Sequence, residues 1–259
     1  MSHLHPHHPI ESLPLSGAKK LLKALTSYYA MALAIAVFFA WLFGWLAEEV
    51  LEHEFTSINT AILLNIHAYH TPVLDELALT ITSIGSPIGI AIIGVLFISS
   101  LLLMKRYVDL GTFAVVLIGA VVLQLTFKLL FHQVRPHVFE PLVVENDFGF
   151  PSGHSLTSFA IWGFFAWWII SLDEASWTIR AVWRWVLGVL GLSIGMLVAL
   201  SRLYVGVHWP TDVLAGMLLA FSWIGVCVTG QRWLTRHARR ERRLAGMKKR
   251  DHGRRRKKV

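Results

Sequence analysis

The chain has 259 residues, of which 55% are hydrophobic and 15% are charged, and its mean hydropathy is +0.56. Charged residues make up about a quarter of soluble proteins, so this composition argues against a water-soluble enzyme. Lysine and arginine outnumber the acids by 24 to 16, but 14 of these 24 cations lie in the last 28 residues. The positive excess therefore belongs to a tail and not to a nucleic-acid-binding face. The lone cysteine, Cys227, excludes an intramolecular disulfide and a cysteine metal cluster.

Apolar runs near the 20 residues that cross a bilayer recur along the chain. There are six, an even number that puts both termini on one side of the membrane: Tyr28–Ala47, Pro87–Met104, Val108–Phe131, Ser155–Leu172, Val182–Leu200 and Val213–Gly230. The first run ends in Glu48-Glu49 instead of a small-residue cleavage site, so we expect a retained anchor and not a signal peptide. The sequence predicts an all-α, polytopic membrane protein with six transmembrane helices.

The segment between the first two runs, Ser57–Thr82, repeats apolar side chains near helical spacing. This pattern predicts an amphipathic helix that lies at the outer membrane interface and breaks at Thr71-Pro72. A loop helix that simply faces solvent is the alternative.

The distribution of positive charge predicts the orientation of the chain. With a cytoplasmic N-terminus, 21 of the 24 cations lie in inner segments, as the positive-inside rule requires. We therefore expect a protein of the inner (plasma) membrane with both termini in the cytoplasm. The remaining cations, Lys128, Arg135 and Arg202, fall at the outer ends of spans. Charges that break the rule beside other polar residues indicate function, on the periplasmic or extracellular face.

Two polar clusters precede the fourth run. Lys128 and Arg135 are two helical turns apart, so we expect both to project from one helix face before Pro136 ends the helix. Two cations on one face suit a polyanion. In the second cluster, Pro151-Ser152-Gly153-His154, Ser152 is predicted to cap a helix whose free N–H groups form an anion site.

The third cluster runs from Ser201-Arg202 to Asp212. Asp212 follows His208 by four residues, close enough to accept a proton from the imidazole and fix its tautomer, and Pro210 is suited to begin the last helix. No cluster of acids accompanies these residues to hold Mg²⁺, and no cysteine or third histidine completes a zinc site, so we expect neither a metal nor a cofactor.

This set of residues fits metal-free phosphoryl transfer. Cations neutralise the phosphoryl oxygens, one imidazole attacks phosphorus, and the other protonates the leaving oxygen. The carboxylate partner makes His208 the better nucleophile, and His154 is then the acid.

The clusters read Lys-x6-Arg-Pro, Pro-Ser-Gly-His and Ser-Arg-x5-His-x3-Asp, and in this order and spacing the chain resembles the type 2 phosphatidic acid phosphatase (PAP2) superfamily of membrane lipid phosphatases. The resemblance implies nucleophilic His208 paired with Asp212, and His154 as acid or base. It also implies a phosphate cradle of Lys128, Arg135, Ser152, Gly153 and Arg202. The short chain and interfacial helix look like the bacterial enzymes that act on phosphatidylglycerophosphate and undecaprenyl pyrophosphate.

The domain organisation follows from these boundaries. We predict a basic, histidine-containing cytoplasmic segment over residues 1–27, a phosphatase domain over 28–230 and a basic cytoplasmic tail over 231–259. The tail either determines topology or contacts anionic lipid.

The predicted partners are a lipid phosphate or pyrophosphate and the bilayer, with no nucleic acid. We predict metal-independent hydrolysis of a lipid phosphate or pyrophosphate (undecaprenyl pyrophosphate, phosphatidylglycerophosphate or phosphatidate class) through a phosphohistidine intermediate. Two alternatives stay open: a phosphotransferase that passes the phosphate to a lipid or glycan acceptor, and a non-catalytic lipid-binding or transport protein.

Overall fold

The computed structural model describes residues 15–172 and 181–256, and all the regular structure in these ranges is helical. The elements are α1 (Leu15–Leu51), α2 (Thr56–His67), α3 (Pro72–Ile84), α4 (Pro87–Leu103), α5 (Tyr107–Phe131), α6 (Gly153–Ser171), α7 (Ala181–Tyr204) and α8 (Pro210–Arg256). The predicted all-α class is confirmed for this part of the chain. The histidine-containing residues 1–14 lie outside it.

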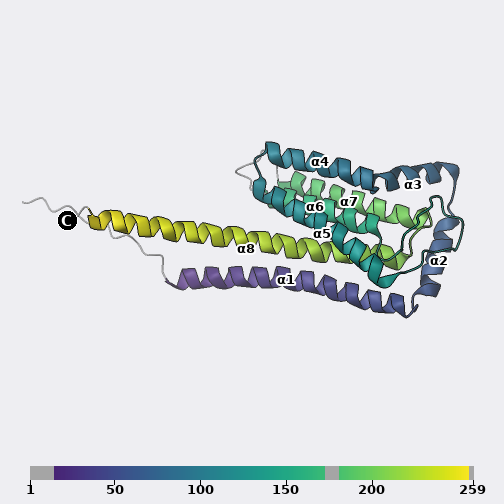
Figure 1. The fold of residues 1–259 in the computed structure, drawn as a ribbon, viewed down its shortest axis with the longest axis horizontal. Helices are drawn as coiled ribbons and strands as arrows, with labels where there is room; N and C mark the ends of the chain where they lie inside the picture. Colours follow the sequence, from purple (N-terminus) through teal and green to yellow (C-terminus); the bar gives the residue numbers. More distant parts are fainter. Residues whose placement is uncertain (1–14, 173–180, 257–259) are drawn as a thin grey trace, which may run out of the picture.

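Helix α6 lies at the centre of the bundle. It packs against α5, α7 and α8, and most of its side chains from Gly153 to Ile169 are buried. The two longest helices, α1 and α8, run side by side, and α8 extends past the ends of the shorter helices (Figure 1). The catalytic candidates of the last three helices are therefore held on one packed core.

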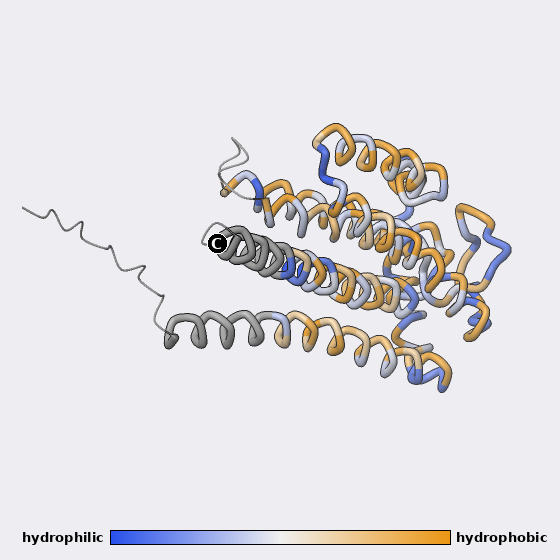
Figure 2. Tube along the Cα trace, turned by 60° about the vertical axis from the view of Figure 1, so that its left-hand side comes forward, coloured by the Kyte–Doolittle hydropathy of each residue, from blue (hydrophilic) through white to orange (hydrophobic). Residues whose placement is uncertain are grey.

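Several helices are long and apolar enough to cross a membrane. Four segments qualify singly, and α3 and α4 qualify together across a bend of 51°. The four are Tyr29–Leu51, Tyr107–Phe131, Ala181–Tyr204 and Pro210–Ala238. Large apolar side chains such as Leu103, Ile88 and Val182 are exposed on the outer surface of the helices. Hydrophobic residues dominate the helices and polar residues gather at their ends (Figure 2), which identifies a polytopic membrane protein.

Two of the six predicted spans are not among the four segments that qualify singly. The run Pro87–Met104 forms α4, whose 17 residues qualify only when α3 is added. The run Ser155–Leu172 forms α6, which opens with polar residues and is mostly covered by other helices. Length and composition therefore identify four or five candidate spans among the described residues.

The segment between the first two runs forms α2 and α3, and the predicted break at Thr71-Pro72 is confirmed. Helix α2 ends at His67, and α3 begins at Pro72 with the Thr71 hydroxyl accepting a hydrogen bond from the N–H of Leu74 (3.3 Å). Helix α2 runs across the end of the bundle, whereas α3 leads into α4 (Figure 1). Asn59 on α2 donates to the Thr211 hydroxyl (3.0 Å), which fixes α2 against the start of α8.

Candidate active site

The three polar clusters meet at the end of the bundle that α2 crosses. Lys128 comes from the last turn of α5, His154 from the first turn of α6, and Arg202 from the last turn of α7. Together with Arg135 and His208 from two loops, they line a cavity of about 490 Å³. Residues more than 70 positions apart in the sequence therefore face one space.

His208 is held in one orientation by Asp212. Its side chain is buried in the loop before α8, and its Nδ1 lies 3.2 Å from Asp212 Oδ2. The same oxygen accepts the N–H of Trp209 (2.9 Å). Pro210 is the first residue of α8, as predicted, and this places Asp212 in the first turn of the helix. Because the carboxylate accepts the Nδ1 proton, the lone pair of the His208 ring lies on Nε2.

Arg135 lies beside that lone pair. Its NH1 is 3.2 Å from His208 Nε2 and also donates to the carbonyl oxygen of Val207 (2.7 Å). Burial, with the positive charges of Arg135 and Arg202, lowers the pKa of His208 well below its usual value of 6.5. The imidazole is therefore neutral at neutral pH, which is the form that can attack phosphorus.

The expectation that Lys128 and Arg135 share one helix face is wrong. Helix α5 ends at Phe131 because His132 adopts a left-handed conformation (φ 48°), so Arg135 lies in the following loop. The two cations still converge, because both form ion pairs with the carboxylate of Asp147. Lys128 is buried, and Arg135 also donates from Nε to the backbone oxygen of Asp147 (2.8 Å).

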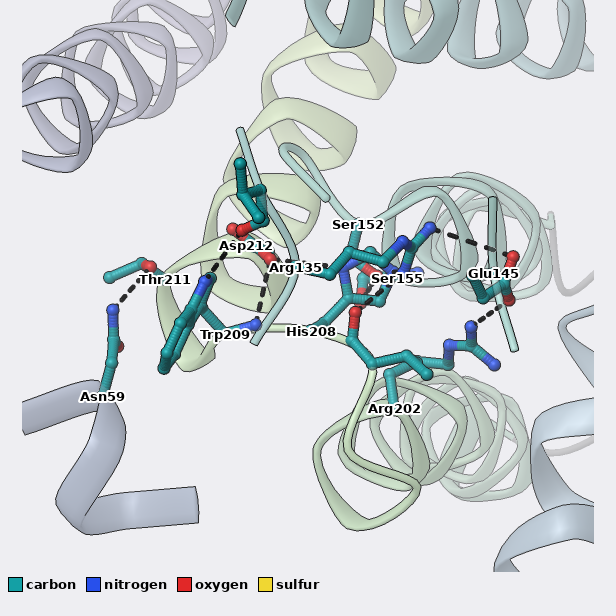
Figure 3. Close-up of polar contacts among 12 residues, drawn as sticks. Asn59, Arg135, Glu145, Ser152, Ser155, Arg202, His208, Trp209, Thr211 and Asp212 are labelled. Atoms are coloured by element: carbon teal, nitrogen blue, oxygen red, sulfur yellow. Dashed lines mark hydrogen bonds and ion pairs between the residues drawn. The ribbon is translucent and has the colours of Figure 1, made fainter. Parts of the chain in front are cut away.

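Two acids in the loop between α5 and α6, Glu145 and Asp147, are part of the site and were missed by the sequence analysis. Glu145 pairs with Arg202 and lies 3.8 Å from Arg135. Burial raises the pKa of Asp147, but hydrogen bonds from Lys128 and Arg135 outweigh this and hold the pKa below its usual value. In Figure 3, Glu145 lies between the guanidinium groups of Arg135 and Arg202. The carboxylates thus occupy positions on the cations that the oxygens of another anion could also take.

The sequence contains a pattern that could have predicted that these acids belong to the site. The loop carries three acids, Glu140, Glu145 and Asp147, beside cations that the positive-inside rule leaves unexplained. Buried cations need counter-charges, and this loop is the nearest source. Within the described ranges, no three His, Cys, Asp or Glu residues are grouped so as to hold a metal ion.

The motif serine is a helix cap and does not line the cavity. Ser152 is fully buried; its Oγ accepts from the N–H of Ser155 (3.5 Å) and from the Ser155 hydroxyl (3.0 Å), as predicted for a cap. Its own N–H donates to the backbone oxygen of Asp212 (3.0 Å). Ser152 therefore fixes the start of α6 to the start of α8, while Gly153 and His154 face the cavity.

Close packing at two glycines positions His154. A Cβ on Gly85, at the bend between α3 and α4, would lie 3.0 Å from His154 Cδ2. A Cβ on Gly153 would collide with the carboxamide of Gln124 on α5. The absence of a side chain at these positions lets α4 and α5 approach the first turn of α6 and leaves its end open to the cavity.

Hydrogen bonds to α3 hold Arg202 and the end of α7 in place. Arg202 NH1 donates to the Thr82 hydroxyl (2.7 Å), and the Tyr204 hydroxyl donates to Asp75 (2.8 Å). Gly206 then turns the chain with φ 80° against the ring of Phe139. The bent pair α3–α4 is thereby tied to the end of α7.

The cavity wall also contains apolar side chains. Pro87 and Ile90 from α4 and Val121 from α5 line it together with the charged groups. Its uncharged polar lining residues include Thr82, Ser83, Ser86, Gln124 and Thr157. This arrangement suits a ligand with a polar anionic head and an apolar body.

Comparison with known proteins finds a matching family model and similar sequences. The PAP2 superfamily model matches residues 109–236, a range that includes all eight predicted site residues. A segment of 133 residues is 35% identical to an undecaprenyl-diphosphatase of Sulfolobus acidocaldarius, covering 48% of this chain and 56% of the relative. A segment of 88 residues is 41% identical to phosphatidylglycerophosphatase B of Bacillus subtilis, covering 34% of this chain and 40% of the relative.

The fold is also similar to a solved structure. The crystal structure of a transmembrane PAP2-type phosphatidylglycerolphosphate phosphatase from Bacillus subtilis superposes with a TM-score of 0.69 at 25% identity. The superposition covers 76% of this chain and 96% of that one. The sequence matches cover less of each protein. This chain spans about half of the length of the two curated relatives.

Proposed function

Because residues 109–236 are a PAP2 superfamily domain, we propose that this protein is a membrane phosphatase that removes the terminal phosphate from a lipid phosphate or pyrophosphate. One observation carries the proposal: three cations and a carboxylate-oriented His208 face a single cavity that is also lined by apolar side chains. The names of the relatives point to two substrate classes, an isoprenoid pyrophosphate and a phosphatidylglycerol phosphate.

Binding begins with an exchange of anions on the cradle. Phosphate oxygens replace the carboxylates of Glu145 and Asp147 on Arg202, Arg135 and Lys128, and the N–H groups at Gly153 complete the cradle. When Arg135 turns to the phosphate, it leaves the Nε2 lone pair of His208. The nucleophile is therefore exposed when the substrate arrives.

The chemical step divides between the two histidines. The Nε2 lone pair of His208 attacks phosphorus, the N–P bond forms, and the bond from phosphorus to the lipid oxygen breaks. The negative charge of the bound phosphate favours the protonated form of His154, which donates its proton to that oxygen, while Asp212 stabilises the positive charge on the His208 ring. Neutral His154 then takes a proton from water as the water attacks phosphorus, the N–P bond breaks, and phosphate leaves.

We further propose that six helices span the membrane, with α6 enclosed by its neighbours, and that α2 lies at the outer interface. Positive charge supports this orientation: Lys105 and Arg106 lie at the end of the bundle opposite the candidate active site. The termini, including the basic tail over 231–259, are then cytoplasmic, residues 28–230 form the phosphatase domain, and the site faces the periplasm or exterior.

Single cysteines test this orientation in a Cys227→Ala background. Glu140→Cys in the outer loop is expected to react with an impermeant maleimide in intact cells, whereas Lys105→Cys reacts only after lysis. The reverse pattern contradicts the proposed sidedness.

Phosphate release tests the activity itself. Purified protein in detergent is assayed with undecaprenyl pyrophosphate, phosphatidylglycerophosphate, phosphatidate and lipid A, with and without EDTA. Release that persists in EDTA is expected, because the proposed steps use side chains alone. His208→Ala is expected to lower the rate by about 10³-fold or more, and His137→Ala, an exposed histidine of the loop between α5 and α6, serves as the control. No release from any lipid, or transfer of the phosphate to an added alcohol in place of water, refutes the hydrolase proposal.

A further inference from the structure

A second polar cavity lies at the other end of the bundle. It has a volume of about 440 Å³ and is bounded by the turn between α4 and α5, the end of α6 and the stretch of α8 from Gln231 to Arg236. Helix α5 connects the two cavities, since Asp109 lines this one and Lys128 lines the candidate active site. That stretch of α5 is about 28 Å long, close to the thickness of the hydrocarbon core of a bilayer, about 30 Å. The two cavities therefore lie at opposite membrane surfaces.

Positive side chains from two distant parts of the chain meet in this cavity. Its lining includes Lys105, Arg106, Arg232 and Arg236. Asp109 is the one carboxylate among the described lining residues, and it is already engaged. Its Oδ2 lies 3.1 Å from Arg106 Nε, and its Oδ1 accepts a hydrogen bond from Gln231 (2.7 Å). Without counting Arg232, the cations Lys105, Arg106 and Arg236 still outnumber the one carboxylate, Asp109, among the described lining residues.

Aromatic rings hold two of these guanidinium groups. The charged carbon of Arg232 lies 5.4 Å from the centre of the Trp167 ring, and that of Arg236 lies 5.0 Å from the centre of the Tyr29 ring. Such cation–π contacts position a guanidinium group but leave its charge intact, because the ring carries no net charge. Trp167 also lines the cavity, at a depth where interfacial aromatic residues are common.

We infer that this cavity binds the phosphate group of an anionic phospholipid of the inner leaflet. The cations supply the attraction, and the cavity lies where headgroups lie. Apolar side chains beside it, such as Leu103, Val108 and Trp233, are exposed and can contact the acyl chains, which a free phosphate ion would not use. The assignment to the inner leaflet rests on the orientation proposed above, whereas binding itself does not depend on catalysis.

The positive-inside rule by itself does not account for this arrangement. That rule requires cations on the cytoplasmic side, but it does not require Lys105 and Arg106 to share one enclosed space with Arg232 and Arg236 of α8. A phosphate bound between them would link α8 to the α4–α5 turn. The lipid is therefore expected to stabilise the packing of the last helix against the rest of the bundle.

Lipid binding to the purified full-length protein tests this inference. Phosphatidylglycerol and phosphatidylcholine with the same acyl chains are titrated in neutral detergent, and retained lipid is counted by native mass spectrometry. Vanadate is present throughout to occupy the candidate active site. Selective retention of phosphatidylglycerol is expected. Equal retention of the two lipids, or displacement of the lipid by millimolar inorganic phosphate, overturns the inference.

Charge variants locate the site. Each basic residue near a membrane surface contributes about fivefold to anionic lipid binding, so Arg236→Gln is expected to weaken phosphatidylglycerol binding about fivefold and Arg106→Gln/Arg236→Gln about 25-fold. The control Arg243→Gln/Arg254→Gln removes the same charge further along the tail and is expected to leave binding unchanged. Phosphatase activity of each variant in detergent checks that it is folded. Equal weakening by the control pair shows that the tail attracts lipid generally and contradicts a built site.

Discussion

Removing the carboxylate of Asp147 is expected to tighten the binding of phosphate to the cradle. In the structure this group forms ion pairs with Lys128 and Arg135, both of which would hold substrate oxygens. The anionic ligand must therefore displace a competitor that belongs to the protein. The side chain of Asp147 is 54% exposed, so solvent screens each ion pair and limits its contribution.

The size of the effect follows from this exposure. Two screened pairs of about 0.2 to 1 kcal/mol each give a total near 1 kcal/mol, which corresponds to about a fivefold change in an apparent dissociation constant. The change Asp147→Asn keeps the shape of the side chain and removes its charge. The inhibition constant of orthovanadate and the KM for the lipid are both expected to fall about fivefold.

The assay is phosphate release in detergent over a range of vanadate concentrations. Glu140→Gln is the matched control, because it removes an exposed acid of the same loop. A higher KM and weaker vanadate inhibition in Asp147→Asn would refute the reasoning, because Asp147 would then be positioning Lys128 and Arg135 for the substrate and not competing with it.

Three further outcomes follow from the site geometry. Asp212→Asn is expected to lower kcat by about 10² to 10⁴-fold without loss of folding, because the amide no longer fixes the His208 tautomer; an unchanged kcat by steady-state assay contradicts that role. The acid limb of kcat/KM is expected below pH 6.5, because burial and nearby cations lower the pKa of His208 and the attacking neutral form persists as pH falls; a limb above 6.5 speaks against His208 as nucleophile. Gly206→Ala is expected to destabilise the fold by about 1 to 2 kcal/mol, because φ is 80° there and Phe139 fills the space; an unchanged Tm contradicts this.

Local signals in the sequence predicted the parts of the site that depend on local chemistry. Pro210 begins α8, Ser152 caps α6, and the chain breaks at Thr71-Pro72, because proline and small polar residues act on their own neighbouring backbone. The spacing of His208 and Asp212 likewise placed the two side chains together within one helical turn.

Features that depend on distant contacts were not predictable in this way. Arg135 was assigned to a helix face, but α5 ends at His132, which adopts a left-handed conformation. The sequence has no glycine, asparagine or aspartate at this position that would predict such a turn. The pairing of Glu145 with Arg202 joins residues 57 positions apart, so it depends on how α7 packs beside the loop. The enclosed position of α6 also depends on packing. Its hydrophobic run resembles the other runs predicted to span the membrane, so the sequence does not distinguish it from them.

The most direct test of the account is the identity of the residue that carries the phosphoryl group. Protein incubated briefly with a lipid substrate labelled on its terminal phosphate is denatured at alkaline pH, digested and mapped by mass spectrometry. The account predicts a phosphohistidine at His208 that is absent in His208→Ala and present in His154→Ala, where protonation of the leaving lipid is slowed but the nucleophile remains. A label on His154 or Ser152, or turnover without any label on His208, would contradict it.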